Sequence, residues 1–358
     1  MAQECNMSYT VEIEPTGDIV EVEDGQTILD AALRQGVYLP HACNHGLCGT
    51  CKVELLEGEV DHGEASPFAL MDMEKDEGKC LACTSTLKED CAIEADIDED
   101  PDARSIPVKD FMGTVIEVKD LTPRIKGVVL ELDDEIDFQA GQYIQYYVPG
   151  FEEPRAFSIA TSPNNKKIIE LNIALILDGV ATPWIHKNVK VGDRRKISGP
   201  FGRFFVKESA QKPMLFFAGG SGLSSPKAMI EEQLENGSTL PITLFHGARN
   251  EEELYYAELF RELEKKYENF TYIPALSDED VKDWHGETGY LNDIAIKKYD
   301  NDFSGHKAYL CGPPGMIDVC ITALMRGRLY ERDIHIERFF SKADMNKENQ
   351  KSPLFKSL

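Results

Sequence analysis

The chain has 358 residues, 42% of them hydrophobic and 28% charged, which suits two or three domains with separate cores better than one compact domain. The formal net charge is −25, and residues 1–102 alone hold 25 acidic against 5 basic side chains, a surface that would repel nucleic-acid phosphates. The first residues lack a signal-peptide pattern, and no uninterrupted apolar run reaches the roughly 18 residues that cross a bilayer. We therefore expect a cytoplasmic protein with neither nucleic acid nor membrane as a partner.

Two breaks in composition divide the chain. Residues 93–107 (IEADIDEDPDARSIP) are acidic and contain two prolines, and residues 207–213 (KESAQKP) interrupt the apolar pattern with polar side chains. We therefore expect three domains and a tail, with the boundaries 1–102 (including the acidic linker), 103–208, 209–342 and 343–358.

The first segment predicts strands, a helix and a cysteine-rich loop. Two alternating runs around the turn PTGD within residues 9–26 predict a β-hairpin, and residues 27–36 have helical spacing that ends at Gly36. The stretch HACNHGLCGTCKV (41–53) then spaces three cysteines as C-x4-C-x2-C, at Cys43, Cys48 and Cys51. This is the spacing of a plant-type [2Fe–2S] ferredoxin, which takes a fourth, more distant thiolate.

The loop must turn sharply to wrap its thiolates around one cluster, and Gly46 and Gly49 permit that turn. Three cysteines compete for the fourth place: Cys80, Cys83 and Cys91. Zinc is the alternative for the whole set, because it is often held by two C-x2-C pairs, and here Cys48/Cys51 and Cys80/Cys83 fit. That pairing would leave Cys43 without a role.

The segments PHACNHGLCGTCKVELLEGEV and GKCLACTSTL resemble the N-terminal ferredoxin domain of multicomponent oxygenase reductases. In that family the distal ligand is the cysteine of a Leu-Ala-Cys triplet, which is Cys83 here. The resemblance implies a β-grasp domain with a [2Fe–2S] cluster on Cys43, Cys48, Cys51 and Cys83, and Cys80 and Cys91 stay open as alternatives for the fourth ligand.

The middle segment is rich in short strand-like runs, such as IKGVVLEL and KIIELNIAL, separated by Gly, Pro and Asn, which predicts an antiparallel β-barrel. Within it, PRAFSIA and LDGVATPW resemble the two flavin motifs of the ferredoxin-reductase family. The resemblance implies FAD, with Arg155 on the diphosphate, the ring of Phe157 stacked on the flavin and Ser158 near N5. The family usually has tyrosine where Phe157 stands. The expected FAD-binding residues are Arg155, Ala156, Phe157, Ser158, Asn172, Ile173, Gly179, Val180, Ala181 and Thr182.

The last segment alternates apolar strands, such as ITLFHGA and FTYIPAL, with helical stretches, such as residues 252–268 (EELYYAELFRELEKKYE), which predicts a parallel, Rossmann-like sheet. MLFFAGGSGLSSP runs from a strand into a glycine-rich turn, YLCGPPGMID follows another strand, and IHIERFF ends the pattern. By resemblance these form a dinucleotide site, with Ser225 where the family has proline. The expected nicotinamide-site residues are Gly219, Gly220, Ser221, Gly222, Arg249, Cys311, Gly312, Pro313, Glu337 and Phe339, and Ser158, Cys311 and Glu337 would be catalytic.

The stretch FHGARNEEELYY bears on the choice between NADH and NADPH, because recognition of the ribose is expected there. Glu251, Glu252 and Glu253 would repel a 2′-phosphate and favour NADH, whereas Arg249 argues for NADPH.

The three motif sets together predict an electron path from NADH through FAD to the cluster. The resemblance covers residues 7–341 and is strongest to phenol hydroxylase reductases, which implies a separate di-iron hydroxylase as partner, met through the acidic ferredoxin domain. The alternatives are the reductase of a Rieske-type aromatic dioxygenase, or a non-enzymatic zinc or redox-sensing module.

Overall fold

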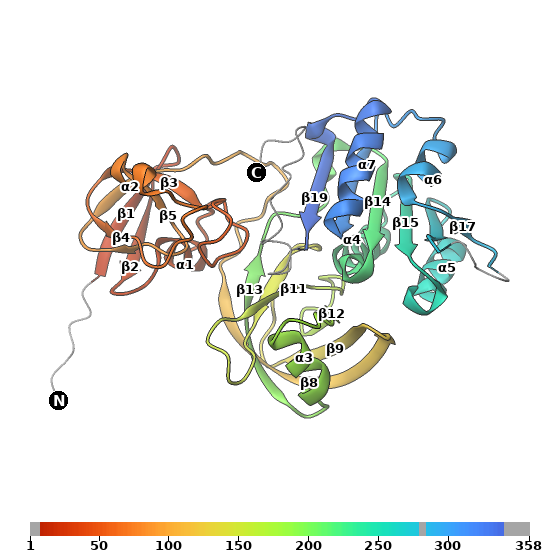
Figure 1. Ribbon diagram of the computed structural model, residues 1–358, viewed down its shortest axis with the longest axis horizontal. Helices are drawn as coiled ribbons and strands as arrows, with labels where there is room; N and C mark the ends of the chain where they lie inside the picture. The colour runs from red at the N-terminus through yellow and green to blue at the C-terminus, as the bar shows by residue number, and fades with distance from the viewer. Residues whose placement is uncertain (1–7, 279–283, 340–358) are drawn as a thin grey trace. The chain divides into compact units, whose positions relative to one another are not determined.

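The computed structural model describes residues 8–278 and 284–339, so the predicted polar tail 343–358 lies outside the described residues. The chain divides into two compact units, one up to Lys109 and one from Asp110 onward. Figure 1 draws both, the first in red and orange. No helix of the described part of the chain is long and apolar enough to span a membrane.

The first unit is built on a five-stranded mixed sheet in the order β2-β1-β7-β3-β5. The predicted hairpin is confirmed: β1 and β2 pair in antiparallel fashion, and β1 also pairs with β7 in parallel. The predicted helix is α1, which Thr27 caps by accepting from the backbone N–H of Asp30. The elements are β1 (Ser8–Glu14), β2 (Asp18–Glu23), α1 (Ile28–Arg34), β3 (Lys52–Glu57), β4 (Val60–Asp61), α2 (Asp72–Asp76), β5 (Lys79–Leu81), β6 (Thr86–Leu87) and β7 (Cys91–Glu94).

The second unit begins with a six-stranded sheet in the order β11-β10-β13-β8-β9-β12. A bridge between Ile159 and Leu171 brings the two edge strands together, so the antiparallel sheet is nearly closed into a barrel, as the sequence predicted. The elements are β8 (Lys109–Thr122), β9 (Ile125–Leu132), β10 (Tyr143–Tyr146), β11 (Arg155–Ser158), β12 (Ile168–Ala174), α3 (Ala181–Asn188) and β13 (Arg194–Phe201), followed by a 3-10 turn, η1 (Glu208–Ala210).

The same unit ends with a parallel sheet in the order β17-β16-β15-β14-β18-β19, which confirms the predicted α/β layer. All six residues of its central strand β14 are buried, as expected for a strand covered on both faces. The elements are β14 (Met214–Gly219), η2 (Gly220–Leu223), α4 (Ser224–Glu235), β15 (Ile242–Ala248), η3 (Glu251–Glu253), α5 (Ala257–Lys266), β16 (Phe270–Leu276), β17 (Glu287–Thr288), α6 (Leu291–Lys298), β18 (Lys307–Gly312), α7 (Pro314–Arg326), η4 (Glu331–Asp333) and β19 (Ile334–Arg338).

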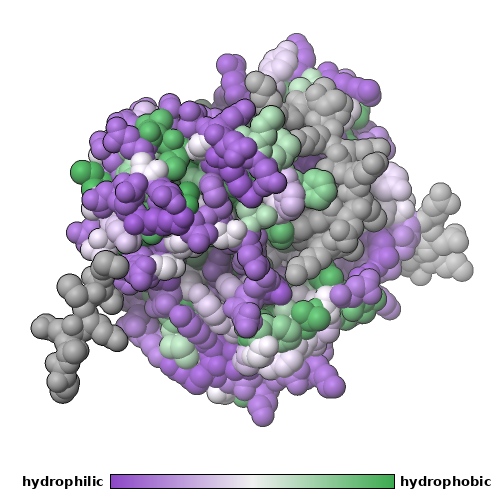
Figure 2. Space-filling view, turned by 60° about the vertical axis from the view of Figure 1, so that its left-hand side comes forward, coloured by the Kyte–Doolittle hydropathy of each residue, from purple (hydrophilic) through white to green (hydrophobic). Residues whose placement is uncertain are grey.

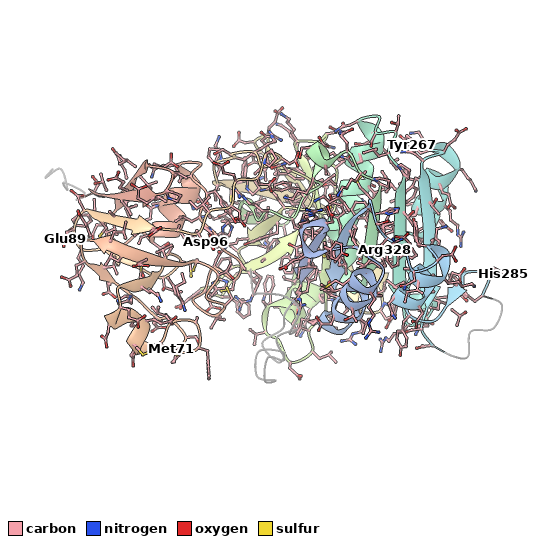
Figure 3. All side chains as sticks on the ribbon, turned by 90° about the horizontal axis from the view of Figure 1, so that it is seen from above. Met71, Glu89, Asp96, Tyr267, His285 and Arg328 are labelled. Atoms are coloured by element: carbon pink, nitrogen blue, oxygen red, sulfur yellow. The ribbon has the colours of Figure 1, made fainter. Side chains whose placement is uncertain are left out.

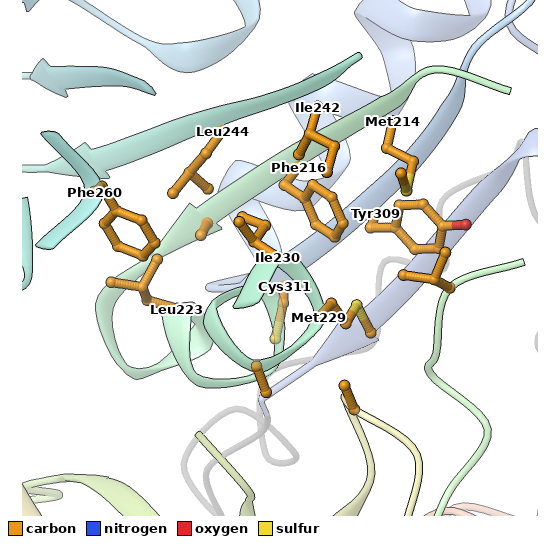
Figure 4. Close-up of a cluster of buried hydrophobic side chains, with 14 of the residues drawn as sticks. Met214, Phe216, Leu223, Met229, Ile230, Ile242, Leu244, Phe260, Tyr309 and Cys311 are labelled. Carbon is orange, nitrogen blue, oxygen red and sulfur yellow. The ribbon is translucent and has the colours of Figure 1, made fainter. Parts of the chain in front are cut away.

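Helix α5 starts later than the helical pattern of residues 252–268 suggested. The chain first forms the 3-10 turn η3, and Tyr256 then takes a positive φ of 58° before the helix begins at Ala257. Both Tyr255 and Tyr256 are thereby turned into packed positions, as partners of a buried hydrophobic cluster under the sheet. Figure 4 shows this cluster, in which Cys311 lies near Met229 of α4.

Exposed large hydrophobic side chains gather in one part of the first unit. Hydrophilic residues dominate the face in Figure 2, with hydrophobic ones in small groups. Phe68 is 97% exposed, and Leu47, Met71 and Met73 are 40%, 50% and 62% exposed. Figure 3 shows the side chain of Met71 at the edge of its unit.

Gly141 lies where the barrel packs against α4, so a substitution at this position tests that packing. Its φ is +100°, and a Cβ there would lie 1.9 Å from the carbonyl oxygen of Phe204 and 2.2 Å from Cε of Met229. Gly150 has a similar φ of +84° with nothing within 4 Å. We expect Gly141→Ala to lose about 1–3 kcal/mol more stability than Gly150→Ala, because only the former also clashes. Thermal unfolding of both variants checks this, and equal shifts in Tm would contradict the packing described.

Candidate functional site

The four predicted cluster cysteines lie around one loop of the first unit. Backbone N–H groups of His45 and Leu47 donate to the Sγ of Cys43, each at 3.4 Å, and that of Gly46 donates to the Sγ of Cys83 at 3.3 Å. N–H groups aimed at sulfur stabilise negative charge on a thiolate. The loop therefore brings Cys83 to the cysteines that precede it by more than 30 residues.

The thiols form two pairs, Cys43 with Cys48 and Cys51 with Cys83. Hydrogen bonding from Cys43 lowers the pKa of Cys48 to about 5, and hydrogen bonding from Cys83 lowers the pKa of Cys51. No three His, Cys, Asp or Glu side chains in the described ranges converge as ligands of a single metal ion. The four thiols are thus arranged as two pairs and not as four ligands around one metal ion.

The loop needs glycine where it turns. Gly46 and Gly49 have φ of +69° and +75°, and Asn44 has +60°. A Cβ on Gly46 would lie 2.8 Å from both the carbonyl oxygen of Glu64 and the Cγ2 of Thr84. The loop therefore packs directly on Glu64 and Thr84. Glycine is needed at position 46 both for the turn and for this close approach.

The two other candidate ligands lie in strands. Cys80, on β5, is fully buried, and burial raises its pKa to about 11. Cys91, at the start of β7, donates from its thiol to the carbonyl oxygens of Glu89 at 3.3 Å and Glu59 at 3.6 Å. Neither receives one of the loop N–H groups described for Cys43 and Cys83.

The predicted flavin residues line the edge of the barrel. Arg155, on β11, donates from Nη1 to the carbonyl oxygens of Glu153 (2.9 Å) and Pro154 (3.0 Å). Phe157 is half-buried and meets Tyr146 edge-on at 6.1 Å between ring centroids. Ser158 is buried. On β12, Ile173 lies in the barrel core, and the side-chain amide of Asn172 is buried beside the hydroxyl of Tyr255.

The predicted diphosphate turn lies at the start of helix α3. Val180 is its N-cap residue and no side chain caps the helix. The hydroxyl of Thr182 accepts from the backbone N–H of Ile176 at 3.0 Å, and the N–H of Gly179 donates to the carbonyl of the same residue at 2.9 Å. The turn is thus pre-formed, with the first N–H groups of the helix available to an anion.

The two halves of the predicted nicotinamide site meet. A Cβ on Gly222 would lie 2.5 Å from the carbonyl of Cys311 and from the Cα of Gly312, and one on Gly312 would lie 2.8 Å from the carbonyl oxygen of Gly219. Gly312 has a φ of +145°. Pro313 then occupies the N-cap position of helix α7, and the N–H of Phe339 points to the carbonyl of Gly312 at 3.5 Å. Glycine is therefore required at positions 222 and 312, because the backbone segments that contain these residues are in direct contact.

One carboxylate oxygen joins the barrel to the parallel sheet. The Oε2 of Glu337 accepts from the hydroxyl of Ser225 at 2.8 Å, from the hydroxyl of Ser158 at 3.4 Å and from the thiol of Cys311 at 3.5 Å. Cys311 and Glu337 are direct neighbours on the parallel strands β18 and β19. The structure thus brings together all three residues expected to be catalytic, and adds Ser225.

Burial controls the ionisation of this group. It raises the pKa of Glu337 to about 7, more than the three donors lower it, and it raises the pKa of the Cys311 thiol well above its ordinary value. Glu337 is therefore poised between its protonated and charged forms near neutral pH, whereas Cys311 stays a neutral thiol.

A second set of contacts holds the barrel to helix α4. The ammonium of Lys227, 5% exposed, donates to the carbonyl oxygen of Ala160 at 2.7 Å and to Glu231 at 3.2 Å, and lies 3.6 Å from Glu170 on β12. The hydroxyl of Tyr256 also donates to Glu170. Nothing in the sequence pointed to this network, because its members are ordinary helix and strand residues that pair only in the fold.

The ribose-side residues form an ion pair. Arg249 pairs with Glu253 through its guanidinium, and this pairing lowers the pKa of Glu253. Glu251 to Glu253 form η3, directly after β15. Arg249, which argued for NADPH, is therefore paired with Glu253, which argued for NADH.

Three family models match the chain in succession. They are the 2Fe-2S iron-sulfur cluster binding domain over residues 11–88, the oxidoreductase FAD-binding domain over 113–206 and the oxidoreductase NAD-binding domain over 216–321. The fold and these domains together define an iron–sulfur flavoprotein reductase.

The similarity to individual proteins is closer still. The chain is 55% identical to the reductase component of phenol 2-monooxygenase from Pseudomonas sp. (strain CF600), over 98% of this chain and 100% of that protein. It is equally similar to the phenol hydroxylase P5 protein of Acinetobacter pittii (strain PHEA-2), with the same coverage. Among solved structures, the cytochrome P450 reductase GcoB of Amycolatopsis matches with a TM-score of 0.85 and 34% identity, over 92% of this chain and 98% of that one.

The chain belongs to the family of phenol hydroxylase reductase components. It is an oxidoreductase that combines an NAD-binding, an FAD-binding and a [2Fe–2S] domain in one polypeptide.

The raised pKa of Glu337 predicts a pH dependence of stability. The native carboxyl keeps its proton up to about pH 7, whereas in the unfolded chain it loses the proton near 4.5. Its contribution to native stability is thus fully present below about pH 4.5 and lost as pH rises to 7. Glu337→Gln has no such proton, so its Tm relative to the unchanged protein should rise between pH 5 and 8. Thermal unfolding across this range checks it; a constant difference would contradict the buried carboxyl.

Proposed function

We propose that this protein passes electrons from NADH through FAD and a [2Fe–2S] cluster to the di-iron hydroxylase of a phenol monooxygenase. FAD, when bound, accepts a hydride from a nicotinamide and releases electrons one at a time to a cluster. The observation that carries the proposal is the meeting of Ser158, Cys311 and Glu337 at one carboxylate oxygen, because these residues come from the flavin barrel and both ends of the dinucleotide site.

We assign the cluster to Cys43, Cys48, Cys51 and Cys83. The two sulfur pairs support this, since a [2Fe–2S] cluster takes two thiolates on each iron. The zinc alternative required Cys80 as a ligand, but the thiol paired with Cys51 is that of Cys83. Because thiolate ligands persist in a reducing compartment, we also propose a cytoplasmic location, and eight free thiols in the described chain are consistent with it.

We assign FAD to the barrel edge formed by β11, β12 and the start of α3. The turn at Gly179–Thr182 would hold the diphosphate with its open N–H groups, and Arg155 would add a guanidinium. Phe157 would stack on the ring system, and Ser158 would donate toward N5. In the nicotinamide half, Ser221 and the glycines around it leave room for a phosphate, and Phe339 would lie by the flavin.

We infer that NADH is preferred over NADPH. The pairing of Arg249 with Glu253 supports this, because a guanidinium already held by a carboxylate offers less to a 2′-phosphate. Glu251 and Glu252, on the same exposed turn, add further negative charge.

We propose that the hydroxylase docks around the cluster loop of the first unit. The backbone N–H of Ser66 donates to the carbonyl of Gly46 at 2.9 Å, so the segment that bears Phe68 and Met71 packs beside the loop. Its exposed apolar side chains lie in a unit whose first 102 residues carry 25 acidic and 5 basic side chains. Such a surface fits a partner with a basic rim around an apolar centre.

An anaerobic titration with NADH tests the electron path. We expect loss of flavin absorbance followed by loss of cluster absorbance, and at least tenfold slower reduction with NADPH. In Cys83→Ser the flavin should still be reduced while the visible bands of the cluster are missing, whereas Cys80→Ser should behave like the unchanged protein. Reduction of flavin with an intact but permanently oxidised cluster would contradict the path, and loss of the cluster in Cys80→Ser alone would contradict the ligand assignment.

Salt dependence tests the docking proposal. Electron delivery to a purified phenol hydroxylase should slow several-fold between 20 and 300 mM NaCl, since screening weakens steering by the acidic unit. Reduction of the protein's own flavin by NADH serves as the control. A rate of delivery that does not change with salt would contradict charge-guided docking.

A further inference from the structure

Ser225 brings a hydroxyl to a position where the family has proline, a residue without one. It lies in the first turn of helix α4, and its side chain is fully buried. Its hydroxyl donates to the Oε2 of Glu337 at 2.8 Å, whereas Ser158 and Cys311 reach the same oxygen at 3.4 and 3.5 Å. The shortest bond to this carboxyl therefore comes from a residue outside the set expected to be catalytic.

The same hydroxyl has a second acceptor, in the barrel. The Oγ of Ser225 lies 3.5 Å from the carbonyl oxygen of Gly141, and it also lies beside the thiol of Cys311. A serine hydroxyl has one proton to donate and lone pairs with which to accept. It donates to Glu337 while that residue is ionised. When the Oε2 of Glu337 carries a proton, the hydroxyl can accept from it and turn its own proton toward Gly141, so Ser225 has a partner in both states.

Burial and hydrogen bonds set the ionisation of Glu337. Burial raises its pKa, and Ser225, Cys311 and Ser158, in decreasing order, lower it. Charged side chains on the neighbouring elements are held in pairs of their own: Arg338 with Asp318, Lys307 with Asp333 and His335, and Lys227 with Glu231. Cys311 is the titratable donor, and burial keeps it a neutral thiol. Loss of the Ser225 hydroxyl should therefore appear directly in the ionisation of Glu337.

We propose that Ser225 is a positioning residue for Glu337, which holds Oε2 between Ser158 and Cys311 and favours the ionised carboxylate during hydride transfer. A carboxylate that accepts a further hydrogen bond is stabilised relative to its protonated form. A nicotinamide that gives up its hydride becomes a cation, which a nearby negative charge stabilises. The inference rests on the proposed function, because that function supplies the nicotinamide and the flavin that accepts the hydride.

The test uses the full-length protein and two matched variants. Ser225→Ala removes the hydroxyl that reaches Glu337. The control, Ser162→Ala, also removes a buried hydroxyl that donates to a carboxylate between the barrel and α4, in this case to Glu235 at 2.7 Å. Both variants lose one hydrogen bond across the same contact, but only the first loses a bond to Glu337. Glu337→Gln with and without Ser225→Ala completes a double-mutant cycle.

Infrared spectroscopy follows the protonated carboxyl group directly between pH 5 and 9, in the oxidised protein without NADH. The difference from Glu337→Gln isolates the signal of Glu337. Its midpoint is expected near pH 7 in the unchanged protein and in Ser162→Ala. In Ser225→Ala it should rise by about one pH unit or more, because a hydrogen bond to a charged group is lost. An unchanged midpoint in Ser225→Ala, or an equal rise in Ser162→Ala, would overturn the inference.

The rate of flavin reduction by NADH is then measured in single turnovers over the same pH range. It should rise with pH through the infrared midpoint. Ser225→Ala should be about fivefold slower at pH 7, and the difference should nearly vanish at pH 9, since a midpoint one pH unit higher lowers the ionised fraction only near neutral pH. Adding Ser225→Ala to Glu337→Gln should leave the rate unchanged.

Two results would assign Ser225 a merely structural role and overturn the inference: slowing by the same factor at every pH, or slowing that persists in the Glu337→Gln background. If NADH did not reduce the flavin of the unchanged protein at all, the proposed function would fail. The infrared midpoint of Ser225→Ala would still decide whether Ser225 controls Glu337, so the two failures are distinguishable.

Discussion

The meeting of Ser158 and Glu337 depends on the buried contact between strand β12 of the barrel and helix α4. Lys227 makes that contact with one ammonium group shared among a backbone carbonyl of the barrel and the carboxylates of Glu170 and Glu231. A buried ion pair adds little net stability once its desolvation is counted, but moving or removing one partner is costly. A change of any one partner is therefore expected to disturb the packing of the barrel on α4.

That alignment has a direct chemical consequence. Ser158 and Glu337 are 179 positions apart in the chain and belong to different sheets, yet the serine donates to the carboxylate. Hydride transfer is sensitive to the placement of the reacting atoms, and a misplacement of about 1 Å can cost about a hundredfold in rate. A barrel displaced on α4 would break the bond to Glu337 and would also move a bound flavin relative to a bound nicotinamide. The polar stripe continues to the end of the helix, where Glu235 accepts from Ser162 and Asn164, each at 2.7 Å.

Local patterns in the sequence predicted most of the fold. Strands β9, β15 and β16 coincide with their apolar runs, and the cysteine spacing located the cluster loop, because these features depend on neighbours in the chain. The start of α5 was wrong by several residues, because the packing of Tyr255 and Tyr256 overrides the helical preference of the preceding glutamates. Tertiary packing is not readable from periodicity.

Within the site, the residues that the sequence missed are those that act across a domain contact. Ser225 stood out only as a replacement for a family proline, and its hydroxyl donates at 2.8 Å to the same oxygen of Glu337 that Ser158 and Cys311 reach. Lys227 gave no local signal at all. By contrast, Cys311 and Glu337 could be paired from motifs, since the register of two adjacent parallel strands brings them side by side.

The uneven charge of the chain suits a protein whose cluster unit must meet two different partners. The cluster unit must receive electrons from its own flavin unit and then deliver them to a separate protein. Residues 103–358 carry 38 acidic and 33 basic side chains, so they exert little net attraction on the strongly acidic first segment. The internal encounter needs none, because a covalent connection already keeps the two units at a high effective concentration. In the proposed docking, charge would steer the external encounter, where no tether exists and where attraction must fade quickly enough, over a Debye length of about 8 Å in physiological salt, for the partner to leave.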